Sequence, residues 1–570
     1  MQDQPNDTSS PAPDPKLGRG ATISRREFLT LAAAAAGTFA VGGLAAACAP
    51  APTPPPPAAT AKPVATAVPA ATAVPTVIKP KSGGKVTWGI EQDPTNLVPY
   101  GAVATANHWG KEPMYESLVT WDKNLIVQPS LAEKWETPDD KTWIWRLRQG
   151  IKFHNGQEVT AEDVKYSMDM QAAPPPPGIT IAQYPSIVST EVVDKYTVKF
   201  NMKGPDPTVL GYLAWERYSP IVPKDMYKTI NPTIQGIGTG PFQLAEYVQN
   251  DRVVFTRNKN YWKPGLPYLD DLILKILPDE NARVAALRSG VIDGCSVTAD
   301  TSRSLKNDPN ITVLSGLFSA PNQIQFTIRK EGNKPLHKKA VRQAMNMAIN
   351  RQDVIDRALG GEAVYSGNIP PGYGDWFISE AELKTKFYKY DAAGAKKLLA
   401  DAGYPNGFSV TMYIISNPPH PQIAEVLKEQ WKQVGIEVTL VAEEITTFAK
   451  RNGEGNFDIC LTGRCMRHDP SGYINEIGRP TAGWAATIFD RGEGWKNDEA
   501  IQLYDKLVTT LDSAQRHAQV RRIQEIGFDE FPQITLFQTR KFLAVRNYLK
   551  DMYVAFTDFY SGLRTAWLDK

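Results

Sequence analysis

Two different periods of hydrophobic residues run through the chain after about residue 84. Alternating or β-rich segments at 86–90 and 141–153 predict half-buried strands. Between Phe408 and Val441, a strand-like run, a helical run, Gly435 and a second strand-like run follow one another. This order predicts a right-handed βαβ unit with parallel strands. We therefore predict an α/β fold in which helices cover mixed sheets.

Local start and stop signals support several helices. Thr160 with Asp163 predicts a capped helix start. Asp279 opens a helical pattern that stops at Gly290, and Asp391 opens another that stops at Gly403.

The first 47 residues carry an export pattern. Arg25 and Arg26 precede an Ala/Gly-rich apolar run that reaches Ala47 and meets Cys48. Twin arginines before such a run resemble a Tat signal, and Leu44 to Cys48 resembles the lipobox of bacterial lipoproteins, in which the thiol is acylated. The usual Leu three residues before the cysteine is here Ala45. We predict a signal peptide over 1–47 and lipidation at Cys48.

Two other interpretations of this segment stay open. A retained transmembrane helix over 28–47 would have about the 20 residues needed to cross a bilayer. A cleaved signal without lipidation is the other. All three place the bulk of the chain outside the cytoplasm, as a periplasmic or surface protein anchored to the cell membrane if Cys48 is lipidated.

A tract rich in Pro, Ala, Thr and Val follows Cys48 and includes four consecutive prolines, Pro54 to Pro57. It lacks the apolar residues of a core, so we expect residues 48–83 to form an extended tether between the membrane and the folded part.

Composition and motifs remove several classes of function. Sixty-three Lys and Arg against 61 Asp and Glu give a formal charge of +2, which argues against nucleic acid as a partner. The six His and four Cys contain no zinc-binding spacing, so no metal site is predicted. No phosphate-binding loop, nucleophile elbow or dinucleotide fingerprint is present, and we predict neither an enzyme nor a cofactor.

Several sequence motifs are more specific than a hydrophobic period. In their residues and in their order along the chain, they resemble the family 5 solute-binding proteins of ABC transporters, which include dipeptide, oligopeptide and nickel binders. The longest is LAEKWETPDDKTWIWRLRQGIKFHNGQEVTAEDVKYSM at 131–168. The others are Gly238-Thr239-Gly240-Pro241-Phe242, Asn260-Tyr261-Trp262, Ser289-Gly290-Val291-Ile292-Asp293, Pro335-Leu336-His337 and Gly403-Tyr404-Pro405-Asn406-Gly407-Phe408.

The resemblance implies a bilobed, periplasmic-binding-protein-like fold of the Venus-flytrap type. Lobe I would comprise 84–325 and be completed by 537–570, and lobe II would comprise 326–536. Two crossing strands, near 322–328 and 533–538, would form a hinge. The protein would act as a monomer that captures a small extracellular solute between its lobes and delivers it to an ABC permease and ATPase pair.

One segment sets this chain apart from the peptide binders that it resembles. Those relatives carry an Asp for the peptide's α-amino group between a Phe-Asp pair and an acidic-Pro pair. Here no carboxylate lies between Asp458 and Asp469, and Met466 or Arg467 occupies the place of that Asp. An ammonium group buried beside an arginine would be repelled.

Arg464, Arg467 and His468 are therefore candidates to face a carboxylate, a phosphate or a polyhydroxyl ligand, or they are solvated or paired with nearby acids. Further ligand-binding candidates are aromatic or polar residues on segments that face the cleft in relatives, where a packing role is the alternative. They are Tyr100, Asn107, Trp376 and Trp484.

Other noteworthy residues have mainly structural interpretations. Trp135, Trp143 and Trp145 alternate as core residues of a strand would, and His154 fits a turn better than a metal site. Cys460 and Cys465 are candidates for a disulfide in an oxidising compartment, which would leave Cys295 as a single thiol.

Peptide uptake is the function expected by default for this family. The arginine-rich segment favours an acidic or carbohydrate-like solute as the alternative, and nickel is a weaker third. A surface sensor or a chaperone-like binding protein with the same fold is a further alternative, since fold does not fix function.

Overall fold

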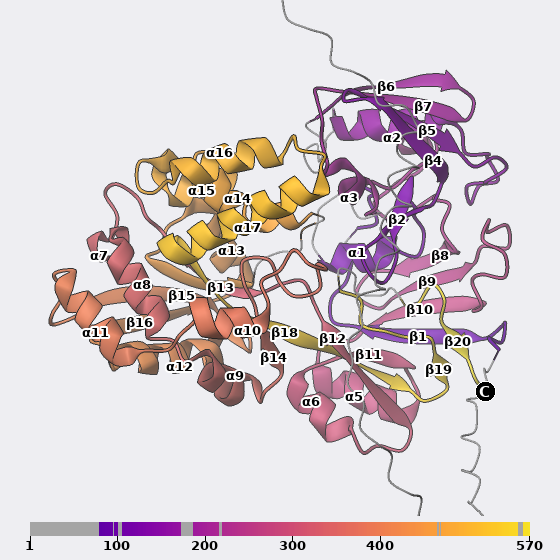
Figure 1. Cartoon of the computed structure of the whole chain (residues 1–570). Coiled ribbons are helices and arrows are strands. Elements are labelled where there is room, and N and C mark those ends of the chain that lie inside the picture. Colours follow the sequence, from indigo (N-terminus) through magenta and orange to yellow (C-terminus); the bar gives the residue numbers. More distant parts are fainter. Residues whose placement is uncertain are drawn as a thin grey trace, which may run out of the picture. The chain divides into compact units, whose positions relative to one another are not determined.

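Figure 1 shows the computed structural model of the chain, which describes residues 79–94, 96–100, 105–172, 186–215, 219–463, 467, 469–556 and 562–570. The predicted signal peptide, Arg25, Arg26, Cys48 and most of the tether lie outside the described residues. Within the described residues, no helix has both the length and the apolar character that crossing a bilayer requires.

The main sheet is mixed and contains 12 of the described strands. Ten follow the order β16-β15-β17-β13-β18-β11-β1-β10-β9-β8, and β12 and β14 each pair with β18. Their bounds are β1 (Lys85–Ile90), β8 (Phe242–Val248), β9 (Arg252–Arg257), β10 (Asp271–Ile276), β11 (Gly294–Val297), β12 (Ile311–Leu317), β13 (Asn322–Phe326), β14 (Ala363–Tyr365), β15 (Phe408–Ile415), β16 (Ile436–Glu443), β17 (Ile459–Gly463) and β18 (Gln533–Arg546).

Strand β18 links the two halves of this sheet. Its first residues, from Gln533 to Phe537, pair with β13, whereas its later residues, from Phe542 to Val545, pair with β11. One long strand thus belongs to both groups of strands.

Two sets of buried residues give the protein two lobes. The largest apolar cluster takes its fully buried members from Ile324 to Phe537. The other clusters draw on residues before 319 and after 541. The predicted bilobed α/β fold with mixed sheets is therefore confirmed. The domain boundaries after residues 325 and 536 stay a prediction.

Lobe I contains a second, antiparallel sheet with the order β4-β5-β7-β6. Trp143 and Trp145 of β5 are buried, as the alternating pattern predicted, and Trp135 of β4 is half-buried against the same core. The rings of Trp143 and Trp145 stack with centroids 5.6 Å apart. The strands are β4 (Ala132–Asp139), β5 (Thr142–Leu147), β6 (Ile187–Asp194) and β7 (Thr197–Met202), and short ladders join β2 (Val119–Trp121) with β3 (Val127–Pro129) and β19 (Leu549–Lys550) with β20 (Trp567–Leu568).

The predicted βαβ unit is formed by β15, α12 (His420–Lys432) and β16, whose strands pair in parallel from Phe408 opposite Ile436. The other helices of lobe II are α7 (Lys334–His337), α8 (Lys339–Met347), α9 (Arg351–Leu359), α10 (Glu380–Glu382), α11 (Ala392–Asp401), α13 (Ile445–Glu454), α14 (Asn475–Gly478), α15 (Gly483–Ile488), α16 (Asp498–Leu507) and α17 (Ser513–Glu530), with a π-helical turn η2 (Leu383–Phe387) and 3-10 turns η3 (Pro470–Tyr473) and η4 (Asp490–Gly492).

The predicted helix caps are present. The Asp279 side chain accepts from the Ala282 amide at the start of α5, and Gly290 ends that helix in the left-handed conformation. Asp391 caps α11 through the Gly394 amide.

The helices of lobe I are α1 (Thr105–Lys111), α2 (Ala161–Ala172), α3 (Val209–Leu213), α4 (Met226–Thr229), α5 (Glu280–Ser289) and α6 (Ala299–Leu305).

Candidate functional site

A cavity of about 490 Å³ lies in lobe I beside the C-terminal segment. Trp121 and Trp215 form part of its wall, with ring centroids 5.8 Å apart. Gly372 of lobe II also lines it, so the cavity adjoins both lobes. The remaining aromatic lining residues are Tyr261, Tyr553 and Phe556, and the charged ones are Glu112, Asp122, Lys123, Lys263 and Arg564. Flat apolar walls with a few charged groups suit a small organic solute.

Most acids around this cavity already have partners. The Asp122 carboxylate accepts from the amides of Asn124 and Ile126, and backbone hydrogen bonds of this kind hold its pKa below the ordinary value. Glu112 lies 3.8 Å from the Arg564 guanidinium. The lining cations thus outnumber the lining carboxylates, three to two.

A second cavity, of about 450 Å³, is lined by lobe II alone. Asp458, immediately before β17, belongs to its lining, together with Arg329 and Asp490. It therefore lies at the opposite end of β17 from the arginine-rich segment. Because closure of two lobes cannot enclose a ligand there, we place the candidate site at the first cavity.

Only part of the arginine-rich segment is described. Arg464, Cys465, Met466 and His468 lie outside the described residues. Arg467 is half-buried; its Nε donates to the Gly472 carbonyl at 3.2 Å, and its own carbonyl accepts from the Tyr373 hydroxyl. Burial raises the pKa of Tyr212 in α3, and the positive charge of Arg467 opposes that rise. Arg467 of lobe II is therefore within electrostatic reach of lobe I.

A buried ion pair holds the end of this segment. The Asp469 carboxylate accepts from Arg516 Nη2 through both oxygens at 3.1 Å, and from the Ser471 amide at 2.9 Å. The two charged side chains are 11% and 10% exposed. Asp469 is therefore paired with Arg516 of α17.

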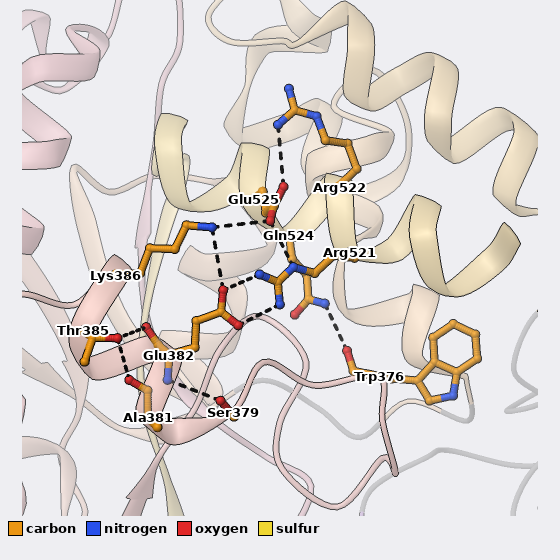
Figure 2. Close-up of polar contacts among 10 residues, drawn as sticks. All are labelled: Trp376, Ser379, Ala381, Glu382, Thr385, Lys386, Arg521, Arg522, Gln524 and Glu525. Carbon is orange, nitrogen blue, oxygen red and sulfur yellow. Dashed lines mark hydrogen bonds and ion pairs between the residues drawn. The ribbon is translucent and has the colours of Figure 1, made fainter. Parts of the chain in front are cut away.

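Trp376 also packs against α17. Its indole stacks on the His517 ring with centroids 3.6 Å apart, and its carbonyl accepts from Gln524 Nε2 at 3.1 Å. Figure 2 shows the hydrogen bond from Gln524 to Trp376 beside the charged residues that join α17 to α10 and η2. Trp376 does not line the 490 Å³ cavity.

The other candidates have different surroundings. Tyr100 is 3% exposed in the lobe I core, where its hydroxyl donates to the Pro220 carbonyl at 2.8 Å. Trp484 packs on the lobe II core and donates from Nε1 to the Asn452 carbonyl at 2.9 Å. The backbone of Asn107 belongs to α1. The structure thus gives Tyr100 and Trp484 packing contacts, and the ligand-binding roles of all the candidates stay predictions.

Only one cysteine of the expected disulfide belongs to the described residues. Cys460 is a buried, free thiol, and its Sγ donates to Gln325 Oε1 at 3.3 Å. Asn452 Nδ2 donates to the same sulfur at 3.1 Å, and burial raises the thiol's pKa. Cys465 lies outside the described residues, so the bond between Cys460 and Cys465 stays a prediction. Cys295 is likewise free and buried.

Glu116 is a buried acceptor that the sequence motifs did not reveal. Its carboxylate is buried and accepts from Trp262 Nε1 at 2.7 Å, Tyr261 Oη at 2.8 Å and Thr239 Oγ1 at 3.1 Å. Lys263 Nζ lies 3.5 Å away. The donors belong to two of the family-like motifs, the one at 238–242 and the one at 260–262. The hydrogen-bonding groups of these motifs were therefore the sequence signal that could have indicated a buried acceptor.

His154 holds the same region together. The Gly238 amide donates to its Nδ1 at 3.3 Å, which leaves Nε2–H to donate to the Gly240 carbonyl at 3.0 Å. A Cβ at Gly238 would lie 2.1 Å from the Met114 carbonyl oxygen, so only glycine fits there. His154 is thus a structural residue of a turn. No group of three or more His, Cys, Asp or Glu that could hold a metal occurs in the described ranges.

Comparison with known proteins identifies the family. The profile described as "Bacterial extracellular solute-binding proteins, family 5 Middle" matches residues 127–484. The chain belongs to this family.

The chain is 28% identical over 452 residues to the Glutathione-binding protein GsiB of Escherichia coli, which covers 78% of the chain and 86% of that protein. It is 28% identical over 464 residues to Heme-binding protein A of Haemophilus influenzae, which covers 75% of the chain and 82% of that protein. The solved structure of AgaA from A. tumefaciens in complex with agropinic acid matches with a TM-score of 0.71 and 26% identity, over 85% of the chain and 99% of that structure.

These relatives are solute-binding proteins, not enzymes, and the family is extracellular. The chain is accordingly an extracellular solute-binding protein of this family.

Proposed function

We propose that this binding protein captures a small acidic solute in the cavity beside Trp121 and Trp215, with Arg467 facing the solute's carboxylate. The position of Arg467 carries the proposal. This residue is half-buried, its charge acts on Tyr212 of α3, and it stands in the segment where peptide-binding relatives hold an amine. It does not itself line the cavity.

Two further observations support an acidic solute. The cations Lys123, Lys263 and Arg564 line the cavity, and ammonium or guanidinium groups can bind a carboxylate. Lys263 and Arg564 also lie 3.5 Å and 3.8 Å from the carboxylates of Glu116 and Glu112. Two relatives bind compounds with acidic groups, since GsiB is named for glutathione and AgaA was solved with agropinic acid. Neutral peptides and neutral oligosaccharides are the competing classes.

Binding of defined probes to the full chain tests this proposal. Native mass spectrometry and calorimetry would compare glutathione and agropinic acid with a neutral-capped tripeptide and maltotriose. We expect an acid to bind, and Arg467→Ala to weaken its binding about fivefold or more because a charged hydrogen bond is lost. Arg357→Ala is the matched control, since this arginine is 47% exposed on α9. Preferred binding of a neutral probe would contradict the acidic assignment.

We also propose that Cys48 is lipidated after Tat-dependent export and that the Pro-rich tract tethers the lobes to the membrane. The twin arginines and the apolar run before Cys48 support this layout. Cys48→Ala should release the protein from the membrane fraction. A variant that stays in that fraction uncleaved would favour a retained helix over 28–47 instead.

Delivery of the solute requires that a permease distinguish the occupied protein. We propose that β13 and β18 act as the hinge and that solute contacts from both lobes favour the closed state. Small-angle scattering of the full chain with and without the bound probe should show compaction, and identical profiles at saturation would contradict closure.

A further inference from the structure

Four segments from both lobes meet in one aromatic cluster beside the cavity. The Tyr373 ring contacts Phe556 edge-on at 5.1 Å between centroids and Tyr473 at 5.5 Å. The Tyr473 hydroxyl donates to the Ser319 carbonyl at 2.6 Å, and the Ser319 amide donates to the Phe556 carbonyl at 2.9 Å. Phe556 belongs to the C-terminal segment that completes lobe I, so the cluster joins the lobes.

Phe556 lies directly against the main chain that precedes Tyr373. Gly372 has a φ of +115°, and a Cβ at this position would be 2.4 Å from the Phe556 ring. Gly372 and Phe556 both line the 490 Å³ cavity. A displacement of the Phe556 ring is therefore transmitted to Tyr373 by direct contact.

The hydroxyl of Tyr373 points to the other side of the cluster. It donates to the carbonyl oxygen of Arg467, and the Tyr373 side chain is almost fully buried. Burial raises the pKa of this phenol, so it remains a donor at neutral pH. A buried hydroxyl and a main-chain carbonyl depend on each other for their hydrogen bonds.

We propose that Tyr373 is a positioning residue: it couples the Phe556 wall of the cavity to the main chain of Arg467 and thereby sets the guanidinium against the solute. This inference rests on the proposed function. Tyr373 and Arg467 both lie outside the lining of the cavity, and Tyr373 acts through Arg467. Its hydroxyl fixes the chain two residues before Asp469, where the Arg516 pair provides the next anchor.

A double-mutant cycle on the full chain tests the coupling. Tyr373→Phe keeps the ring contacts and removes the hydroxyl that reaches Arg467. We expect a threefold to tenfold loss of affinity for the acidic probe, glutathione or agropinic acid, as for one hydrogen bond. In an Arg467→Ala background the same change should have no further effect, because the residue through which Tyr373 acts is absent.

Tyr388→Phe is the matched control. Tyr388 is also buried in lobe II and donates its hydroxyl to a main-chain carbonyl, that of Ser366, at 2.9 Å. Both variants should lose comparable stability, but only Tyr373→Phe should change affinity. An equal affinity loss on the wild-type and Arg467→Ala backgrounds would overturn the proposal, because Tyr373 would then act by another route.

Hydrogen exchange without ligand gives a second, independent readout. Tyr373→Phe should accelerate amide exchange in the peptide that spans 464–469 at least threefold, and Tyr388→Phe should leave it unchanged. If no acidic probe binds the wild-type chain, the proposed function fails, and this measurement alone decides the positioning role. Unchanged exchange in Tyr373→Phe would overturn that role.

Discussion

Two arginines of α17 each contact a carboxylate elsewhere in lobe II, but they do so in very different surroundings. The Arg516 and Asp469 side chains are 10% and 11% exposed. The Arg521 and Glu382 side chains are 39% and 31% exposed, and Figure 2 shows that Lys386 and Glu525 extend their contacts into a surface network. Burial, and not the number of charges, should decide how much each ion pair contributes to the free energy of unfolding.

The difference follows from what replaces a lost partner. At the exposed pair, water solvates the remaining charge, so such pairs contribute little stability. At the buried pair, a lone guanidinium or carboxylate would be left without compensation, which is costly. The buried pair also anchors the segment that carries Arg467, whereas the exposed pair attaches α10 to the surface of α17.

The largest expected effect is that of Asp469→Ala. It leaves Arg516 charged and buried, so we expect a loss of about 3–5 kcal/mol in the free energy of unfolding, measured with urea. The double variant Asp469→Ala with Arg516→Met should recover a large part of this loss, because no buried charge remains. A loss below about 1 kcal/mol for the single variant would mean that water reaches Arg516 and that burial does not separate the two pairs.

Glu116 of lobe I sharpens the comparison, because it is buried as Asp469 is but has mainly neutral donors. Glu116→Gln keeps the shape of the side chain but removes its charge and turns one acceptor into a donor that faces Trp262 or Tyr261. We expect a loss of about 2–3 kcal/mol in unfolding free energy. The exposed Glu133 of β4 provides the control, and Glu133→Gln should change little. Equal losses of unfolding free energy for Glu116→Gln and Glu133→Gln would contradict a stabilising role of the buried Glu116 carboxylate.

Local patterns predicted the fold well where the interacting residues are close in sequence. The caps of α5 and the alternation of β5 involve neighbours within a few positions, and the βαβ unit needed only its own 34-residue segment, 408–441. The lobes themselves were predicted through the family resemblance, because no local pattern states that β18 pairs with both β13 and β11.

The site was predicted less well, for a physical reason. Its organising contacts join distant positions: 47 residues separate Asp469 from Arg516, and 146 separate Glu116 from Trp262. Residue type alone does not distinguish an aromatic ring that binds from one that packs, as Tyr100 in the lobe I core illustrates. Arg467 was found because its position departs from the pattern of peptide-binding relatives.

Acid should weaken the Glu116 region through His154. Burial lowers the pKa of His154 to about 4, so the ring is neutral in the folded protein, whereas it titrates near 6.5 when unfolded. The contribution of neutral His154 to the free energy of unfolding is thus fully present above about pH 6.5. It is lost as the pH falls toward 4, and the loss is about 1–2 kcal/mol at pH 5. Urea unfolding at pH 7 and pH 5 measures this. His154→Gln should lose most of the pH dependence in this window, and an unchanged dependence would assign it to other groups.

The smallest expected effect is that of Glu382→Ala at the exposed pair. We expect a loss of about 0.5 kcal/mol in unfolding free energy at low salt, because the ion pair is largely solvated and Arg521 can still contact Glu525 at 3.0 Å. The Arg521 hydrogen bond lowers the pKa of Glu382, so this contribution is present above about pH 4.5 and disappears as the pH falls through the lowered value. About 1 M salt should abolish it by screening, but should hardly change the effect of Asp469→Ala. A loss of several kcal/mol for Glu382→Ala that persists in salt would show that exposure does not distinguish Arg516 from Arg521. The contrast between the buried ion pair that holds the Arg467 segment and the exposed ion pair on α17 would then fail.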